Sequence, residues 1–175
     1  MSGGTVNMGI RALQETDLEE LAELYVQFWG ETSCLEKMQK TFRRLNENPD
    51  YIFLVAEHKG HIAGSLMGII CEELYGDCRP FLVIEDVIVD RNFRHTGIGS
   101  ALIRKIENCA ISRNCNYIIF VTESERTEAQ PFYQSLGYSP DAYRGFKKRL
   151  GKQTGKTLPG VRTEIPTPET TRDIH

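Results

Sequence analysis

The fold of this chain is decided by one short stretch, Arg94-His95-Thr96-Gly97-Ile98-Gly99-Ser100, which joins an apolar strand to an amphipathic helix. The strand is expected over residues 81–89, an almost continuous apolar run of the kind that is covered on both faces of a sheet. The helix is expected from Ile98 onward, where apolar residues recur at helical spacing. Gly97 and Gly99 allow a tight turn and a close approach of a ligand to the main chain. The free N–H groups of the first helical turn favour an anion, and Arg94 adds a positive charge beside them.

Two other phosphate-binding motifs do not fit the sequence. A dinucleotide-binding fingerprint needs a third glycine three residues after Gly99, where this chain has Leu102. A triphosphate-binding loop needs four residues between its glycines, but Gly151 and Gly155 are separated by three and follow no buried strand. A tight loop that binds nothing is the remaining structural alternative, so the ligand has to be identified from the rest of the chain.

The pattern on either side of this stretch predicts a mixed α/β fold. Expected strands, taken from β-branched and aromatic runs between turn residues, cover 7–13, 51–57, 61–71, 81–89 and 117–122, with a final pair around 138 and over 143–150. Expected helices, taken from the 3.6-residue period, cover 18–29, 35–45, 98–110 and 129–136. The order β-αα-βββ-α-β-α-β corresponds to an α/β (α+β) protein with helices on both faces of the sheet.

The chain is expected to divide into a folded part, residues 1–150, and a tail, residues 151–175. Its length of 175 residues is that of one ordinary domain. The tail is rich in proline and threonine and has few large apolar residues, so we expect it to be a flexible or extended arm. Such an arm could dock on a partner or on a second copy of the chain, which makes a homodimer one expected assembly.

Composition argues against several classes of function. The net charge of −3 gives no sign of the basic surface that binds nucleic acid. No run approaches the ~18 apolar residues of a membrane helix, and the first seven residues do not resemble a secretory signal, so we expect a cytoplasmic protein with no membrane partner. The five cysteines lack CxxC spacing and the four histidines do not cluster, so neither a disulfide framework nor a metal site is expected.

Two motifs resemble those of a known superfamily. Arg94-x-x-Gly97-x-Gly99, after the strand Ile84-Glu85-Asp86-Val87-Ile88-Val89, looks like the acetyl-CoA-binding motif of the GCN5-related N-acetyltransferase (GNAT) superfamily. Phe132-Tyr133-Gln134-Ser135-Leu136-Gly137-Tyr138 resembles the second motif of that superfamily, at the expected distance downstream. The order of elements also agrees over roughly residues 8–150. The resemblance implies a mostly antiparallel sheet whose central strands splay apart, and transfer of an acetyl group from acetyl-CoA to an amine.

The resemblance also assigns residues to the binding of acetyl-CoA. The backbone N–H groups of His95, Thr96, Gly97, Ile98, Gly99 and Ser100 would cradle the CoA pyrophosphate beside Arg94. The pantetheine arm would pair like an added strand with the main chain of Val87, Ile88 and Val89. Many members carry an asparagine seven residues before the tyrosine of the second motif, whereas this chain has Arg126, which could reach a phosphate instead.

Two carboxylates interrupt the apolar strand, Glu85 and Asp86, and a charge on a covered strand is costly unless it is paired or functional. In a regular strand the two would point to opposite faces, and Glu85 would share a face with Val87. In several polyamine- and amino-sugar-acetylating members, the glutamate of a similar Ile-Glu-Asp strand serves as base, often through water. We therefore assign Glu85 as the candidate catalytic base, with an ion pair to a nearby Arg or Lys as the structural alternative. Asp86 is expected to be structural and is the second candidate for the base.

Tyr133 is the candidate catalytic acid. A phenol is protonated at neutral pH and can donate to a departing thiolate, and the resemblance places this tyrosine beside the CoA sulfur. The structural alternative is a core aromatic side chain next to Phe132. The donor to the oxyanion is expected to be a backbone N–H near Val87.

The acceptor is predicted from aromatic and acidic residues in the regions that contact it in the superfamily. These residues are Phe28, Trp29, Glu31, Glu72, Glu73, Asp77, Glu123 and Glu125. They suit a small cationic amine such as a polyamine, an amino sugar or an aminoglycoside, although an ordinary solvated surface explains the carboxylates equally well. The alternatives are a peptide or protein amine as acceptor, or a non-catalytic CoA-binding regulatory domain.

Overall fold

The computed structural model describes residues 8–123, 127–139 and 145–148. Contacts divide the chain into two units, Met1–Ala142 and Tyr143–His175, and every described helix and strand belongs to the first unit. The strands are β1 (Met8–Ala12), β2 (Tyr51–His58), β3 (His61–Cys71), β4 (Phe81–Val89) and β5 (Ile118–Ile119). The helices are α1 (Leu18–Trp29), α2 (Leu35–Asn46), α3 (Ile98–Ser112) and α4 (Ala129–Ser135), with 3-10 turns at Glu15–Asp17 and Arg91–Phe93.

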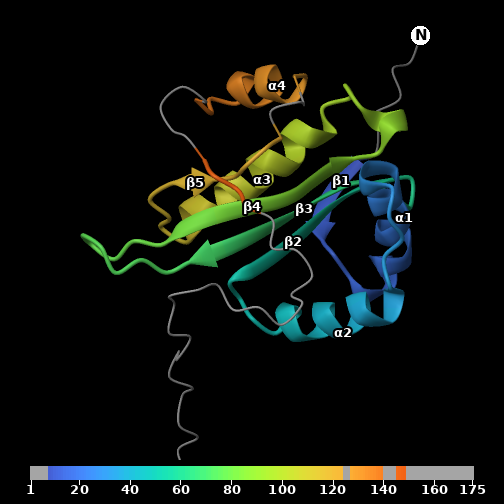
Figure 1. Ribbon diagram of the computed structural model, residues 1–175, viewed down its shortest axis with the longest axis horizontal. Coiled ribbons are helices and arrows are strands. Elements are labelled where there is room, and N and C mark those ends of the chain that lie inside the picture. The colour runs from blue at the N-terminus through green and yellow to red at the C-terminus, as the bar shows by residue number, and fades with distance from the viewer. Residues whose placement is uncertain (1–7, 124–126, 140–144, 149–175) are drawn as a thin grey trace, which may run out of the picture. The chain divides into compact units, whose positions relative to one another are not determined.

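The five strands form one sheet in the order β1-β2-β3-β4-β5 (Figure 1). Every neighbouring pair is antiparallel except β4 and β5, which are parallel. The predicted mixed sheet and the predicted order of elements are confirmed as far as α4. The final strand pair is not found in the described part of its region, because Tyr138, Ser139 and residues 145–148 belong to no strand. The rest of that prediction, residues 140–144 and 149–150, lies outside the described residues.

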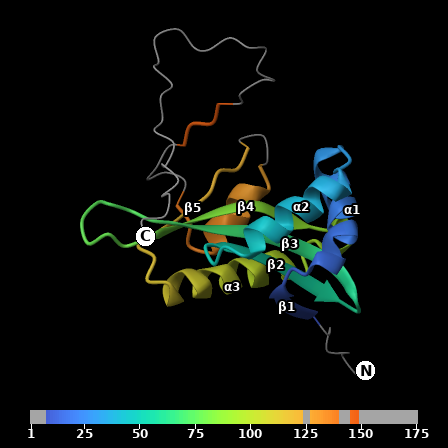
Figure 2. The ribbon, with the colours of Figure 1, turned by 90° about the horizontal axis from the view of Figure 1, so that it is seen from below.

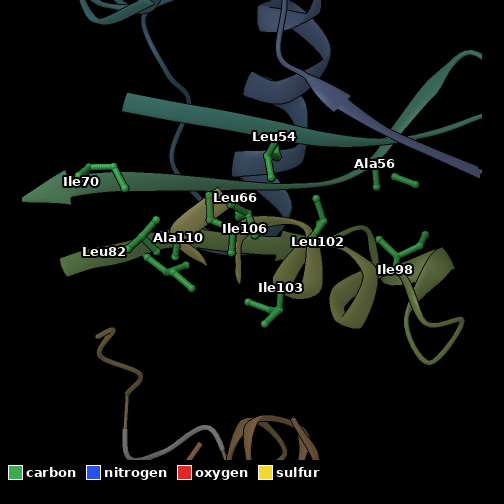
Figure 3. Close-up of a cluster of buried hydrophobic side chains, with 12 residues drawn as sticks. Leu54, Ala56, Leu66, Ile70, Leu82, Ile98, Leu102, Ile103, Ile106 and Ala110 are labelled. Carbon is green, nitrogen blue, oxygen red and sulfur yellow. The ribbon is translucent and has the colours of Figure 1, made fainter. Parts of the chain in front are cut away.

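Helices cover both faces of the sheet, as predicted. α1 and α2 pack on one face, and α3 packs on the other together with side chains of α4 (Figure 1). Figure 3 shows the cluster of buried side chains between α3 and the sheet. Removing such apolar surface from water is the main favourable contribution to folding. The members of this cluster that are at most 1% exposed, apart from two alanines, are Leu66, Leu82, Ile84, Leu102, Ile103 and Ile106.

Two glycines of β3 let α3 lie close to the sheet. A Cβ atom at Gly68 would lie 2.6 Å from Cδ1 of Ile106, and one at Gly64 would lie 3.0 Å from Cγ2 of Ile98. Neither distance leaves room for a methyl group in a close-packed core. The position of α3, which begins at the predicted anion-binding turn, therefore depends on two glycines of β3. The helical periodicity of residues 98–110 does not reveal this dependence.

We expect Gly68→Ala to lower the free energy of unfolding by about 1–3 kcal/mol, because the fully buried Ile106 would have to move against close-packed neighbours. Gly9→Ala is the matched control, since Gly9 is also a strand glycine but no atom lies within 4 Å of its added Cβ. Its free energy of unfolding should change by less than about 0.5 kcal/mol. Denaturant unfolding of both variants measures the difference, and equal stabilities would show that α3 does not require the close approach.

The loop between β3 and β4, drawn in green, projects beyond the sheet in two perpendicular views (Figures 1 and 2). It carries the acidic residues Glu72, Glu73 and Asp77 and is exposed: Leu74 and Tyr75 are 95% and 84% exposed, and Glu72 and Asp77 are also exposed. This loop is therefore accessible to molecules in solution.

Candidate active site

A β-bulge interrupts β4 at the predicted catalytic carboxylates. Glu85 pairs with Met67 and Ile88 pairs with Ser65, so two residues of β4, Asp86 and Val87, oppose a single residue of β3. The backbone of Asp86 has a φ of 55°, which is unusual for a residue other than glycine. Bulges re-aim side chains and are frequent beside active sites.

The bulge reverses which residues of β4 face each helical layer. Ile84 and Val87 both pack in the cluster under α3, although they are three positions apart and would point to opposite faces in a regular strand. Ile88 packs instead with α1 and α2. The predicted common face for Glu85 and Val87 is therefore wrong, because that prediction assumed a regular strand. Glu85 alternates with the buried Ile84 and is exposed on the opposite face.

Glu85 makes no hydrogen bond or ion pair with any other residue that the structure describes. The structural alternative for this carboxylate, an ion pair with a nearby Arg or Lys, is thus not realised within residues 8–123, 127–139 and 145–148. Asp86 has a different environment, since its charge acts on Tyr25 of α1. Burial, and after it the charge of Asp86, raises the pKa of the Tyr25 hydroxyl.

β4 and β5 separate after a short parallel contact. They pair at Leu82 with Ile118 and at Val83 with Ile119, and β5 ends there while β4 continues to Val89. β5 is shorter than the strand predicted over 117–122, because after Ile119 the chain no longer pairs with β4. Beyond Val83, the edge of β4 on this side has no strand partner among the described residues, which confirms the predicted splaying of the central strands.

The turn between β4 and α3, which is the predicted anion-binding turn, contains two residues with positive φ and is open on one side. Gly97 is the N-cap residue of α3 with a φ of 90°, and His95 has a φ of 62°. The Thr96 hydroxyl donates to the Phe93 carbonyl at 2.5 Å and ties the turn together. No atom outside the neighbouring residues lies within 4 Å of a Cβ built on Gly97, so the space beside the turn is open. The first N–H groups of α3 point out of the helix end without intrahelical acceptors.

Gly99 has a different role from Gly97. A Cβ at Gly99 would lie 3.1 Å from the ring of Phe132 on α4 and 3.7 Å from Val89. Gly99 therefore lets the second motif approach the first turn of α3, which the sequence interpretation had not assigned to it. The N–H of Gly99 still belongs to the first turn, with those of Ile98 and Ser100.

A pocket of about 240 Å³ adjoins this turn. It brings together the end of β4, the segment after it, the C-terminal part of α1 and the start of α4. Of the residues predicted to bind acetyl-CoA, Val89 and Arg94 line the pocket. The full lining is Gln27, Phe28, Val89, Arg94, Glu128 and Ala129. Sequence reasoning missed Gln27, because one exposed glutamine on an amphipathic helix carries no local signal.

Tyr133 lies in an aromatic cluster on the α3 side of the sheet. Its ring centroid is 4.3 Å from that of Phe120, 4.9 Å from Phe132 and 6.2 Å from Tyr138. The ring therefore packs as the structural alternative predicted, and the half-buried side chain adjoins the core. The Tyr138 hydroxyl donates to Glu107 at 2.9 Å; burial and this carboxylate raise the pKa of Tyr138. Arg126 lies outside the described residues.

In the part of the chain that the structure describes, no three His, Cys, Asp or Glu side chains are grouped in a way that could hold a metal ion. All five cysteines are free. None of the described helices has the length and apolar character needed to cross a membrane.

Comparison with known proteins identifies relatives across most of the chain. Residues 18–138 match the model of the Acetyltransferase (GNAT) family. An acetyltransferase of Yersinia enterocolitica is 31% identical over 147 residues, which are 82% of this chain and 96% of the relative. A glucosamine 6-phosphate N-acetyltransferase of Trypanosoma brucei brucei is 28% identical over 135 residues, 76% of this chain and 90% of the relative. A solved aminoglycoside N-acetyltransferase in complex with CoA has a TM-score of 0.72 at 21% identity, covering 87% of this chain and 100% of that one.

The splayed mixed sheet, covered by helices on both faces, is a GNAT-type fold like that of the solved acetyltransferases. The chain belongs to the acetyltransferase (GNAT) family and is an N-acetyltransferase. Members of this family use acetyl-CoA as the acetyl donor.

Proposed function

We propose that this protein transfers the acetyl group of acetyl-CoA directly to a primary amine of a small cationic molecule. The observation that carries the proposal is the open turn at Gly97 beside the half of β4 that has no strand partner on its β5 side among the described residues. One site thus offers N–H donors for a pyrophosphate and a strand edge for an extended arm.

The residues present fit CoA at both ends of this site. The N–H groups of residues 95–100 and the charge of Arg94 would hold the pyrophosphate, and Val87, Ile88 and Val89 would pair with the pantetheine arm. A backbone N–H near Val87 would donate to the oxyanion. Acetyl-CoA supplies an activated thioester carbon, whose C–S bond breaks as the amine nitrogen forms the new C–N bond.

Glu85 would take the proton that the attacking amine loses, directly or through water. Its carboxylate is exposed and makes no hydrogen bond or ion pair with the other described residues, so no described cation neutralises it. A base of this kind typically contributes a factor of about 10²–10⁴ to the rate. Asp86 sits at the bulge with its charge acting on Tyr25, which supports a structural role for that residue.

Tyr133 would donate a proton to the departing thiolate. We expect Tyr133→Phe to lower the rate of acetyl transfer about ten-fold or more, while the affinity for CoA survives. The ring keeps its packing against Phe120 and Phe132, so the melting temperature should stay close to that of the wild type. Tyr138→Phe is the matched control, because it removes a hydroxyl that is bonded to Glu107. Equal turnover in wild type and Tyr133→Phe would refute the assignment.

The acceptor class is supported by exposed aromatic and acidic groups and by the relatives. Trp29 is 47% exposed at the end of α1 and packs edge-on against Phe28, which lines the pocket beside the cradle. Glu128 lines the same pocket as Phe28, and an aromatic surface with a carboxylate nearby suits a cationic amine. The named relatives that act on amino sugars and aminoglycosides favour the same class.

A screen of amines with acetyl-CoA tests the proposal, with the released CoA thiol as readout. Polyamines, amino sugars and aminoglycosides should release thiol faster than basic peptides. Release with peptides alone would replace the small-molecule acceptor by a protein or peptide amine. Normal CoA binding without release for any of these amines would favour the non-catalytic alternative.

A further inference from the structure

A glutamine of α1 is hydrogen bonded to the segment that leads into the cradle. Gln27 Nε2 donates to Oδ2 of Asp90 at 2.8 Å, and Gln27 Oε1 accepts from the Arg91 N–H at 3.4 Å. Gln27 and Asp90 are 63 residues apart in sequence. One side chain amide therefore contacts both residues at the exit of β4, with its donor and its acceptor in use.

These contacts continue through the turn to the cradle. Asp90 Oδ1 accepts from the Asn92 N–H at 2.7 Å, and the Asp90 carbonyl accepts from the Phe93 N–H at 2.9 Å. The Phe93 carbonyl in turn accepts the Thr96 hydroxyl, next to Gly97. A continuous series of hydrogen bonds thus runs from α1 to the N-terminus of α3.

We propose that Gln27 is a positioning residue that holds the CoA cradle, residues 94–100, in its binding conformation. This inference rests on the proposed function. The cradle contains His95, which has a φ of 62°, and a residue other than glycine keeps such a backbone only when its surroundings fix it. Gln27 also lines the pocket beside Arg94 and Val89, so it acts at the same site. A preorganised cradle binds its ligand without the entropy cost of ordering the turn.

Gln27 also adjoins the residues that we assign to the acceptor side. It directly precedes Phe28 and Trp29 on α1, and it lines the same pocket as Phe28 and Arg94. A shift of α1 on binding of the acceptor would therefore reach the cradle through Asp90. Loss of the Gln27–Asp90 hydrogen bond should therefore weaken CoA binding more than it lowers the stability of the fold.

The test is isothermal titration of wild type and three variants with CoA. Gln27→Ala removes both hydrogen bonds without adding a charge and should raise the Kd of CoA about five-fold or more. Gln39→Ala is the matched control, because Gln39 lies on α2 and makes no side-chain hydrogen bond with the described residues. Its Kd should equal that of the wild type.

The third variant exchanges donor and acceptor in the pair Gln27→Glu with Asp90→Asn. The new carboxylate accepts from the new amide and from the Arg91 N–H, while the amide oxygen still accepts from the Asn92 N–H. All three hydrogen bonds are restored and the net charge is unchanged. The Kd of CoA should return to within about two-fold of the wild-type value.

Three results are distinguishable, with melting temperatures recorded for every variant. A wild-type Kd in Gln27→Ala, or no recovery in the exchanged pair, overturns the role of Gln27. A lower melting temperature with an unchanged Kd shows that Gln27 only stabilises the fold. No CoA binding by the wild type contradicts the proposed function itself.

Discussion

Gly97→Val is expected to weaken CoA binding by at least about 100-fold, since it would remove two or more hydrogen bonds to a charged pyrophosphate. Gly97 has a φ of 90°, which a β-branched residue does not adopt without strain, so the turn would rearrange. The added side chain would also occupy the space that is open beside the turn. Isothermal titration with CoA measures the effect.

Gly60→Val is the matched control for this substitution. Gly60 has a φ of 83° in the β2–β3 turn, and no atom lies within 4 Å of its added Cβ. It therefore imposes a comparable backbone strain at a site that we do not assign to CoA. Both variants should lose stability, but only Gly97→Val should lose CoA. Normal affinity in Gly97→Val would remove the assignment of residues 95–100 to the pyrophosphate.

Glu85→Gln is expected to lower the rate of acetyl transfer about ten-fold or more at saturating acetyl-CoA, because the amide cannot accept the proton of the amine. The substitution keeps the shape of the side chain, and Glu85 has no hydrogen bond or ion pair with the described residues that could be lost. The melting temperature and the Kd of CoA should therefore match the wild type. Initial rates of thiol release measure the effect.

Two further variants make this result specific. Glu47→Gln, at an exposed position after α2, controls for the loss of one negative charge. Asp86→Asn tests the second candidate for the base. A large loss of rate in Asp86→Asn together with a normal rate in Glu85→Gln would transfer the role of base to Asp86.

The regular elements of this fold could be predicted because their signals are local. The apolar run of β4, the helical spacing from Ile98 onward and the turn between β2 and β3 each predict an element that the structure contains. The placement of Gly97 at the start of α3 followed from the same patterns. These features depend on residues close together in the chain.

Features that depend on distant residues were not predictable from the pattern. The bulge at Asp86 is set by pairing of β4 with β3, and it changes the face of every later residue of the strand. The need for glycine at position 68 comes from Ile106 on α3. The contact of Gln27 with Asp90 joins two polar side chains without any periodic signal. The candidate site residues were therefore predicted by motif, while their surroundings required the structure.

The central claim is tested most directly by a crystal structure of the protein with CoA. The account predicts pyrophosphate oxygens within hydrogen-bond distance of the backbone N–H groups of residues 95–100, and a pantetheine arm paired with residues 87–89. The sulfur should lie between the Glu85 carboxylate and the Tyr133 hydroxyl. CoA bound elsewhere, with the turn at Gly97 empty, would contradict the account.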